Sequence, residues 1–346
     1  MERINTLCGS VSKDDVSLIC PHEHLILDMT HEAIRPQTPE DAKLLDSEIT
    51  MELLGKLRRN PYIVRDNLRL NSAEDAISEL QYLSASGCDL LVDLTSVGLG
   101  RDIRKLQKIA NAVNIPIVVG CGLYVHDVIP EAYRTLTEQQ IADWMISEIR
   151  QGIEGSGIRP GVIGEIGVSE KVYPEERRSL LGAAQASLET GLPIYVHTYP
   201  WSRAGLEAAD LLLEAGVPAR KICLCHLDVA FDFTYILQAL ERDIVVEFDN
   251  FSKEFYFEGQ DGAFSGGPFE TDTSRVRMLK KLHTMGFGKQ LLLANDLCLK
   301  ISYHKYGGWG YDHIFTNIIP MMRMEGFEEN EIHELLWENP KNFLFQ

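Results

Sequence analysis

The stretch GVIGEIGVSEKVYPEERRSLLGAAQASLETGLPIYVHT, residues 161–198, contains two apolar runs separated by an amphipathic segment. The runs at 161–167 and 193–198 are mostly apolar rather than alternating, which is typical of strands buried on both faces. The segment between them, 174–191, begins with proline and ends with glycine, the residues favoured at the start of a helix and just past its end. The stretch therefore predicts strand, helix and strand, and this alternation favours a parallel sheet.

The same alternation extends along the whole chain. Helix-like stretches include 72–86, which opens with a serine N-cap, and 137–153, whose Thr137 and Gln140 have the spacing of a capping box. Eight strand–helix units predict a closed (β/α)8 barrel, an α/β fold, formed by a single domain over residues 1–346. A doubly wound open sheet is the alternative, although no GxGxxG motif follows the first strand. The eight predicted strands are 18–25, 90–96, 115–122, 161–167, 193–198, 222–228, 244–250 and 290–297.

Two segments do not fit simple barrel connections. Residues 28–71, between the first two strands, are charge-rich and too long for a plain helix, so we predict an insertion over the barrel mouth. Residues 251–272, after the seventh strand, are rich in aromatic residues and glycine and predict a long loop. Loops at this end of such a barrel shape the substrate pocket.

The composition excludes several classes of function. Lysine and arginine number 33 against 51 aspartates and glutamates, and the net charge of −18 argues against binding to nucleic acid or to an anionic membrane. No signal peptide and no stretch of about 18 uncharged apolar residues is apparent. Seven cysteines without a CxxC pair fit a reducing cytoplasm. The expected partner is a small-molecule substrate, and a homodimer is the default oligomer.

Histidines and carboxylates recur near the carboxyl ends of the predicted strands. His22 and His24 alternate on the first strand, so both imidazoles project from the same face. Carboxyl ends of parallel strands meet at one end of the barrel, where these enzymes place their chemistry. Each residue alone also fits an ordinary hydrogen-bonded core or turn position, but the shared register favours a metal site. The other candidates come from four further strands: Glu165, His197, His226 and Asp296.

A binuclear site of divalent ions requires neutral imidazoles and carboxylates that offset about four positive charges. His22, His24 and Asp296 would hold one ion, and the histidines of the fifth and sixth strands would hold the other. Glu165 would bridge them. Two ions about 3.5–4 Å apart share a water and lower its pKa toward neutrality, and Asp296 would take the proton from the attacking hydroxide. Zinc fits this ligand set, as do manganese and cobalt.

Motifs spread along the chain point to a known family. PHEH, GEIGVSEKVYPEERR, ETGLPIYVHT, CHLD, ND and GGWGYDHI…IPMM…ENPKNF occur in this order. Together they resemble the phosphotriesterase-like branch of the amidohydrolase superfamily, and within it the phosphotriesterase homology proteins. The resemblance covers nearly the whole chain and implies a (β/α)8 barrel, two divalent metals and a bridging hydroxide. The metal-ligand positions that the resemblance implies fall on the same six residues.

The bridging ligand differs from that of the best-known members of this family. Those members use a carboxylated lysine on the fourth strand, whereas GVIGEIG contains no lysine and Lys171 lies past the strand end. Glu165 instead resembles the glutamate bridge of the homology proteins. This difference weakens the prediction of organophosphate hydrolysis as an activity.

The reaction class implied by the resemblance is metal-assisted hydrolysis, with a lactone or other carboxyl ester as the preferred substrate. Lys253, Lys300 and Tyr303 follow the seventh and eighth strands, where the lysines would bind a substrate anion such as that of a phosphorylated sugar lactone. Solvated lysines on loops are the alternative. Tyr124, after the third strand, would line the pocket or donate to a carbonyl oxygen.

Two further classes of function stay open. An amidase, a deaminase or a phosphoester hydrolase would use the same metal ligands and differ in the loops. A catalytically silent metal-binding protein would also keep them, although the presence of all six ligands and the proton-shuttling Asp296 argues against it.

Overall fold

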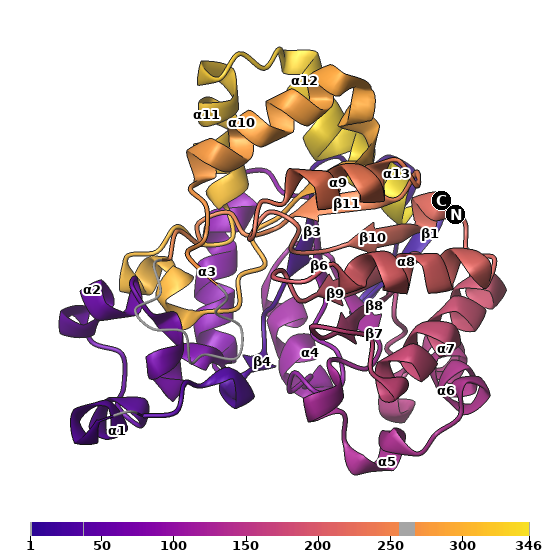
Figure 1. Ribbon diagram of the computed structural model, residues 1–346, viewed down its shortest axis with the longest axis horizontal. Helices are drawn as coiled ribbons and strands as arrows, with labels where there is room; N and C mark the ends of the chain where they lie inside the picture. Colours follow the sequence, from indigo (N-terminus) through magenta and orange to yellow (C-terminus); the bar gives the residue numbers. More distant parts are fainter. Residues whose placement is uncertain (1, 37, 256–266, 346) are drawn as a thin grey trace.

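Eight parallel strands surrounded by helices form a nearly closed barrel in the computed structural model, which describes residues 2–36, 38–255 and 267–345 (Figure 1). The backbone N–H of Asp296 donates to the carbonyl of His22 at 3.3 Å, so the segment after the last strand lies beside the first. Seven of the eight strands lie within ranges predicted from sequence, β8 extends one residue beyond its range, to Val168, and the barrel prediction is confirmed. In order around the barrel the strands are β3 (Ile19–Glu23), β6 (Leu90–Asp93), β7 (Ile117–Cys121), β8 (Val162–Val168), β9 (Ile194–Thr198), β10 (Ile222–Leu224), β11 (Val245–Phe248) and β12 (Leu291–Leu293).

The three helices predicted in detail begin and end as expected. The Ser72 hydroxyl accepts from the N–H of Asp75, and Thr137 and Gln140 form the reciprocal capping box. Gly191 follows its helix with φ of 79°, a conformation that favours glycine. The longer helices are α3 (Ala73–Ala85), α4 (Ile103–Ala112), α6 (Glu138–Gln151), α7 (Pro174–Thr190), α8 (Ala204–Glu214), α9 (Phe233–Leu240) and α10 (Asp272–Leu282), and the shorter ones are α5 (Glu131–Arg134), α11 (Ile319–Met324), α12 (Glu329–His333) and α13 (Asn339–Leu344).

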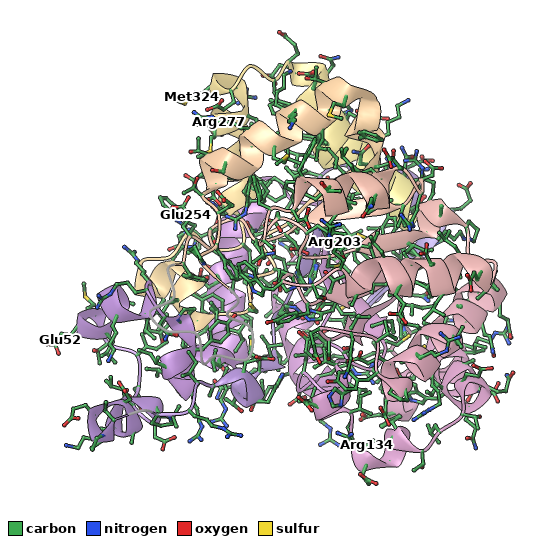
Figure 2. The ribbon with its side chains drawn as sticks, in the orientation of Figure 1. Glu52, Arg134, Arg203, Glu254, Arg277 and Met324 are labelled. Atoms are coloured by element: carbon green, nitrogen blue, oxygen red, sulfur yellow. The ribbon has the colours of Figure 1, made fainter. Side chains whose placement is uncertain are left out.

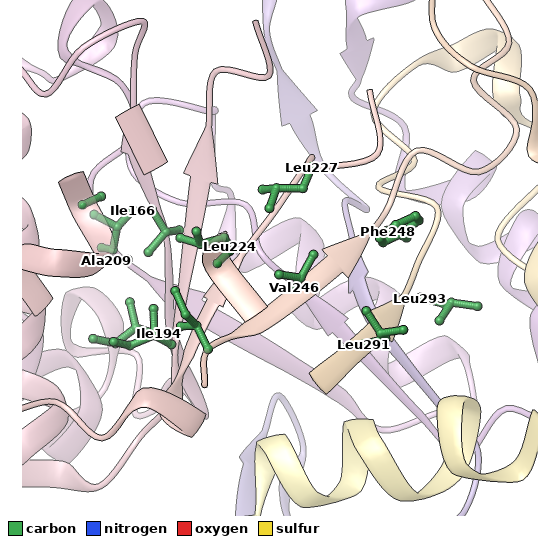
Figure 3. Close-up of a cluster of buried hydrophobic side chains, with 14 of the residues drawn as sticks. Ile166, Ile194, Ala209, Leu224, Leu227, Val246, Phe248, Leu291 and Leu293 are labelled. Carbon is green, nitrogen blue, oxygen red and sulfur yellow. The ribbon is translucent and has the colours of Figure 1, made fainter. Parts of the chain in front are cut away.

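Both faces of the barrel strands are buried. Ile194 and Val196 of β9 belong to the apolar layer between strands and helices, which Figure 3 shows around Ile194, Leu224 and Val246. Tyr195, between them in sequence, belongs to the cluster inside the barrel, where its ring centroid lies 5.0 Å from that of Phe343. Burying one such aliphatic side chain stabilises the fold by roughly 1.5–3 kcal/mol. This double burial explains why the strand sequences are apolar without alternation.

The insertion between the first two barrel strands is closed at its base by two short strands, β4 (Leu27–Asp28) and β5 (Arg69–Leu70), which pair antiparallel. Between them lie α1 (Pro39–Leu45) and α2 (Leu54–Leu57), which project from the barrel in Figure 1. Glu52, in this segment, points outward in Figure 2. Of the loop predicted at 251–272, residues 256–266 lie outside the described residues.

A two-stranded sheet precedes the barrel and consists of β1 (Arg3–Thr6) and β2 (Gly9–Ser12). All seven cysteines lie among the described residues and have free thiols, and six of them are buried. None of the described helices has the length and apolar character needed to cross a membrane.

Candidate metal centre and active site

Glu165 lies at the centre of a group of imidazoles at the carboxyl end of the barrel. Its side chain, on β8, is 1% exposed. Oε1 lies 3.1 Å from Nε2 of His226 and 3.5 Å from Nε2 of His22, while Oε2 lies 3.7 Å from Nε2 of His24. One carboxylate therefore faces imidazoles that come from the first and sixth barrel strands.

The two remaining predicted ligands complete the group. His197, at the end of β9, places Nδ1 2.9 Å from Nε2 of His226 and 3.7 Å from Oε1 of Glu165. Asp296, three residues after β12, places Oδ1 3.1 Å from Nε2 of His24. The structure thus brings together all six predicted metal-ligating side chains, as their shared register requires.

The ligand atoms form two sets of three that share Glu165. The first set is His22, His24 and Glu165, and the second is Glu165, His197 and His226; within each set the atoms all lie within 4.8 Å of one another. Two adjacent sets joined by one carboxylate fit two divalent ions with a bridging ligand. The chemistry of the donors, four imidazoles and two carboxylates, suits zinc, manganese or cobalt.

One ring nitrogen of His22 supports this fit. Its Nδ1 lies 2.8 Å from Oε2 of Glu247, so the carboxylate holds the N–H at that position. Its Nε2 is buried and has no hydrogen-bond partner among the described residues. A buried ring nitrogen that lies near Glu165 and Asp296 and has no hydrogen-bond partner fits the role of a metal ligand.

Two of the other imidazoles are likewise oriented by a hydrogen-bond partner at the second ring nitrogen. Nδ1 of His226 lies 3.0 Å from Oδ1 of Asp249, and Nδ1 of His24 lies 2.8 Å from Oγ1 of Thr95. Glu247 and Asp249 were not among the site residues predicted from sequence. A signal was available in IVVEFDN, residues 244–250, because two acids inside an apolar strand are costly unless they are paired.

Another buried carboxylate holds the loop that carries Asp296. Glu23 accepts from the N–H of Asn295 at 3.1 Å and from the N–H of Leu297 at 2.8 Å. Because these are the residues on either side of Asp296, Glu23 fixes the backbone at that position. Glu23 was not predicted from sequence either, although it lies between the two histidines of PHEH.

The carboxylates of the group remain ionised at neutral pH. Burial raises the pKa of Glu165, but the neighbouring imidazoles, His22 first, outweigh burial and hold it well below its usual range. Burial also raises the pKa of Asp296, and the Lys253 ammonium lowers it to about 2. For His226, burial lowers the pKa, but Asp249 and Glu165 raise it to about 10. The pocket thus stabilises positive charge, which favours cation binding.

Uptake of metal at pH 7 is expected to release protons. His22 and His226 have raised pKa values and hold a proton below those values, whereas a ligating imidazole must be neutral. Apparent metal affinity should therefore rise with pH by about tenfold per unit for each proton released. Calorimetric titration with zinc in buffers of different ionisation enthalpy measures the number released. Zero protons released would contradict this charge assignment.

A largely apolar cavity lies over the metal-ligating group. Two of the four predicted substrate contacts line it: Tyr124, whose hydroxyl lies 3.1 Å from Nδ1 of His197, and Lys253, whose Nζ donates to Oδ1 of Asn250 at 3.1 Å and pairs with Asp296. The described lining residues are His24, Leu27, Met29, Glu32, Tyr62, Leu99, Tyr124, Glu165, His197, His226, Asn250, Lys253, Phe269, Asp296, Cys298 and Leu299.

The other two predicted substrate contacts lie elsewhere. Lys300 is buried and pairs with Asp66 of the insertion. Tyr303 is 2% exposed and its hydroxyl lies 3.3 Å from that of Tyr311. Neither is among the described residues that line the cavity. Lys300 instead attaches the segment after β12 to the insertion, and Tyr303 makes its contact within that segment.

Comparisons with known proteins bear on the family of this chain. A human N-acetyltaurine hydrolase is 32% identical over 348 residues, which cover 99% of this chain and 97% of that protein. The solved structure of a resiniferatoxin-binding protein from Rhodobacter sphaeroides has a TM-score of 0.94 at 32% identity and covers 99% of this chain and 95% of its own. A phosphotriesterase homology protein from Escherichia coli, solved with phosphate in its active site, has a TM-score of 0.78 at 26% identity, with coverage of 96% and 99%. The model of the phosphotriesterase family matches residues 2–344. The chain therefore belongs to the phosphotriesterase family of metal-dependent hydrolases.

Proposed function

We propose that this chain hydrolyses a small N-acyl amide at a binuclear metal centre bridged by Glu165. The observation that carries the proposal is the pair of ligand sets that share this carboxylate at the floor of the cavity. The choice of an amide draws on the relatives, whose name states hydrolysis of N-acetyltaurine. A lactone or other carboxyl ester, the substrate predicted from sequence, is the second candidate, because apolar walls such as Leu27, Leu99 and Phe269 suit an uncharged acyl chain.

The residues have distinct roles in this reaction. Two bound divalent ions would supply a water of lowered pKa and polarise the scissile carbonyl. The four histidines and Glu165 would hold these ions, with Glu165 belonging to both ligand sets. Asp296 accepts the proton of the attacking water on its carboxylate and returns it to the leaving amine, so water and amide become a carboxylic acid and an amine. Lys253 keeps Asp296 ionised and in place, and the Tyr124 hydroxyl is available to orient the substrate carbonyl.

A substrate panel tests the choice of an amide. Zinc-loaded protein would be assayed with N-acetyltaurine, N-acetylethanolamine, lactones with and without a phosphate group, simple esters and an organophosphate. Released amine and released acid would both be measured. We expect kcat/KM for at least one amide to exceed that for every lactone by about tenfold or more. Turnover of lactones with no cleavage of any amide, at confirmed metal content, would overturn the proposal in favour of the second candidate.

A further inference from the structure

Glu32 is the one described carboxylate in the cavity that belongs neither to the ligand sets nor to the proposed proton shuttle. It ends the short 3-10 helix Thr30–Glu32 of the insertion. It lines the cavity over the metal-ligating group and also an adjoining hollow, whose other lining residues include His31, Asp127, Glu170 and Tyr199. His197 lines both spaces as well. Glu32 and the candidate metal ligand His197 therefore both lie where the two spaces meet.

One oxygen of Glu32 has no donor. Oε1 lies 3.3 Å from Nε2 of His31. Oε2 is shielded from solvent and has no hydrogen-bond partner among the described residues, although the side chain as a whole is 15% exposed. A shielded carboxylate oxygen without a donor loses its hydration, and no hydrogen bond within the protein replaces it. A ligand that supplies an N–H group would remove this cost.

Apart from the two ions that the ligand sets would hold, the described residues of the cavity offer little to a negatively charged substituent. Lys253 is the one lysine or arginine among the described lining residues, and its ammonium is already paired with Asp296 and bonded to Asn250. Leu27, Leu99 and other apolar side chains form much of the wall. The Glu32 carboxylate is therefore complementary to a positively charged group on the ligand.

We infer that Glu32 selects the substrate by binding an ammonium group, so that this chain acts on N-acyl amides whose amine portion is cationic. The inference rests on the proposed amide hydrolysis and names its substrate class. This class differs in charge from N-acetyltaurine, the compound in the relatives' name, whose amine portion ends in a sulfonate. The acyl carbonyl would lie at the ligand sets, and the ammonium would extend toward the junction of the two spaces at Glu32.

Three amides that differ at one end test the inference. N-acetylethylenediamine, N-acetylethanolamine and N-acetyltaurine share the acetamide and the two-carbon chain and end in an ammonium, a hydroxyl and a sulfonate. We expect kcat/KM to fall in that order, with at least about a tenfold difference between the first and the last. In Glu32→Gln the ammonium compound should lose most of this advantage while the hydroxyl compound changes little. Glu170→Gln is the matched control, because it removes one charge from the adjoining hollow where the carboxylate already accepts from Tyr173.

Binding to metal-free protein provides a readout that does not depend on turnover. Calorimetry in the presence of a chelator should give the same order of affinity for the three compounds in the wild type. In Glu32→Gln the differences in affinity should be smaller. Equal binding of all three, or tightest binding of the sulfonate, would overturn the role of Glu32. If all three are hydrolysed at similar rates, the charge selection fails and amide hydrolysis stands. If none is hydrolysed but the binding order holds, amide hydrolysis fails and Glu32 still recognises the ammonium.

Discussion

Replacement of Asp296 by asparagine is expected to lower kcat by about a thousandfold with little change in KM. Asparagine keeps the shape of the side chain but cannot take a proton from water at neutral pH. Asp296 lines the cavity, and its Oδ1 lies 3.1 Å from Nε2 of His24. With a pKa of about 2, burial being outweighed mainly by the Lys253 ammonium, the carboxylate is ionised wherever the enzyme would work. Steady-state kinetics on the best amide, with metal content measured for each sample, checks this expectation.

A second carboxylate–lysine pair provides the control for this experiment. Asp66 pairs with buried Lys300, as Asp296 pairs with Lys253, but neither Asp66 nor Lys300 is among the described residues that line the cavity. Asp66→Asn also leaves an ammonium without its counter-ion, so its loss of thermal stability should be similar while its turnover stays near that of the wild type. Full activity in Asp296→Asn with two metals bound would contradict the assigned role.

Replacement of Glu165 by glutamine should reduce both metal content and turnover. The carboxylate is shared by the two ligand sets, so its loss weakens both at once. We expect fewer than two zinc ions per chain after dialysis and a fall in kcat/KM of at least about a hundredfold. Mass spectrometry of the metal in purified protein gives the stoichiometry. Intact mass should show no carboxylated lysine, in keeping with the absence of lysine from β8.

Glu148 serves as the matched position for Glu165. It is also buried, but it pairs with Arg101 on the helical side of the barrel. Glu148→Gln should lose stability because the arginine is left unpaired, while the purified protein keeps two metals. Two tightly bound zinc ions in Glu165→Gln would show that the bridge is another ligand.

Much of the fold was predictable because each barrel strand is buried on both faces. Double burial leaves apolar runs that are easy to recognise, as at 193–198, and caps such as Ser72 and Gly191 mark the helix ends. The convergence of Glu165 with four histidines followed from the same reasoning, since parallel strands bring their carboxyl ends together. The family was recognisable from motifs at these positions.

The surroundings of the site were less predictable, for a physical reason. Glu247 and Asp249 orient imidazoles through partners more than 20 residues away in sequence, and no local period reports such contacts. Lys300 looked like a residue of the mouth from its place after β12, but Asp66, in a segment without periodic pattern, pairs with it away from the cavity. Glu32 lies in the same insertion, where its position depends on tertiary packing alone.

The most direct test of the account is a metal titration followed by turnover. Protein stripped with a chelator, and confirmed metal-free, would receive zinc in steps while hydrolysis of the best amide is measured. The shared Glu165 predicts that stripped protein is inactive and that activity rises to its full value at two zinc ions per chain. Full activity without metal, or a maximum at one ion that a second does not change, would contradict a binuclear hydrolytic centre.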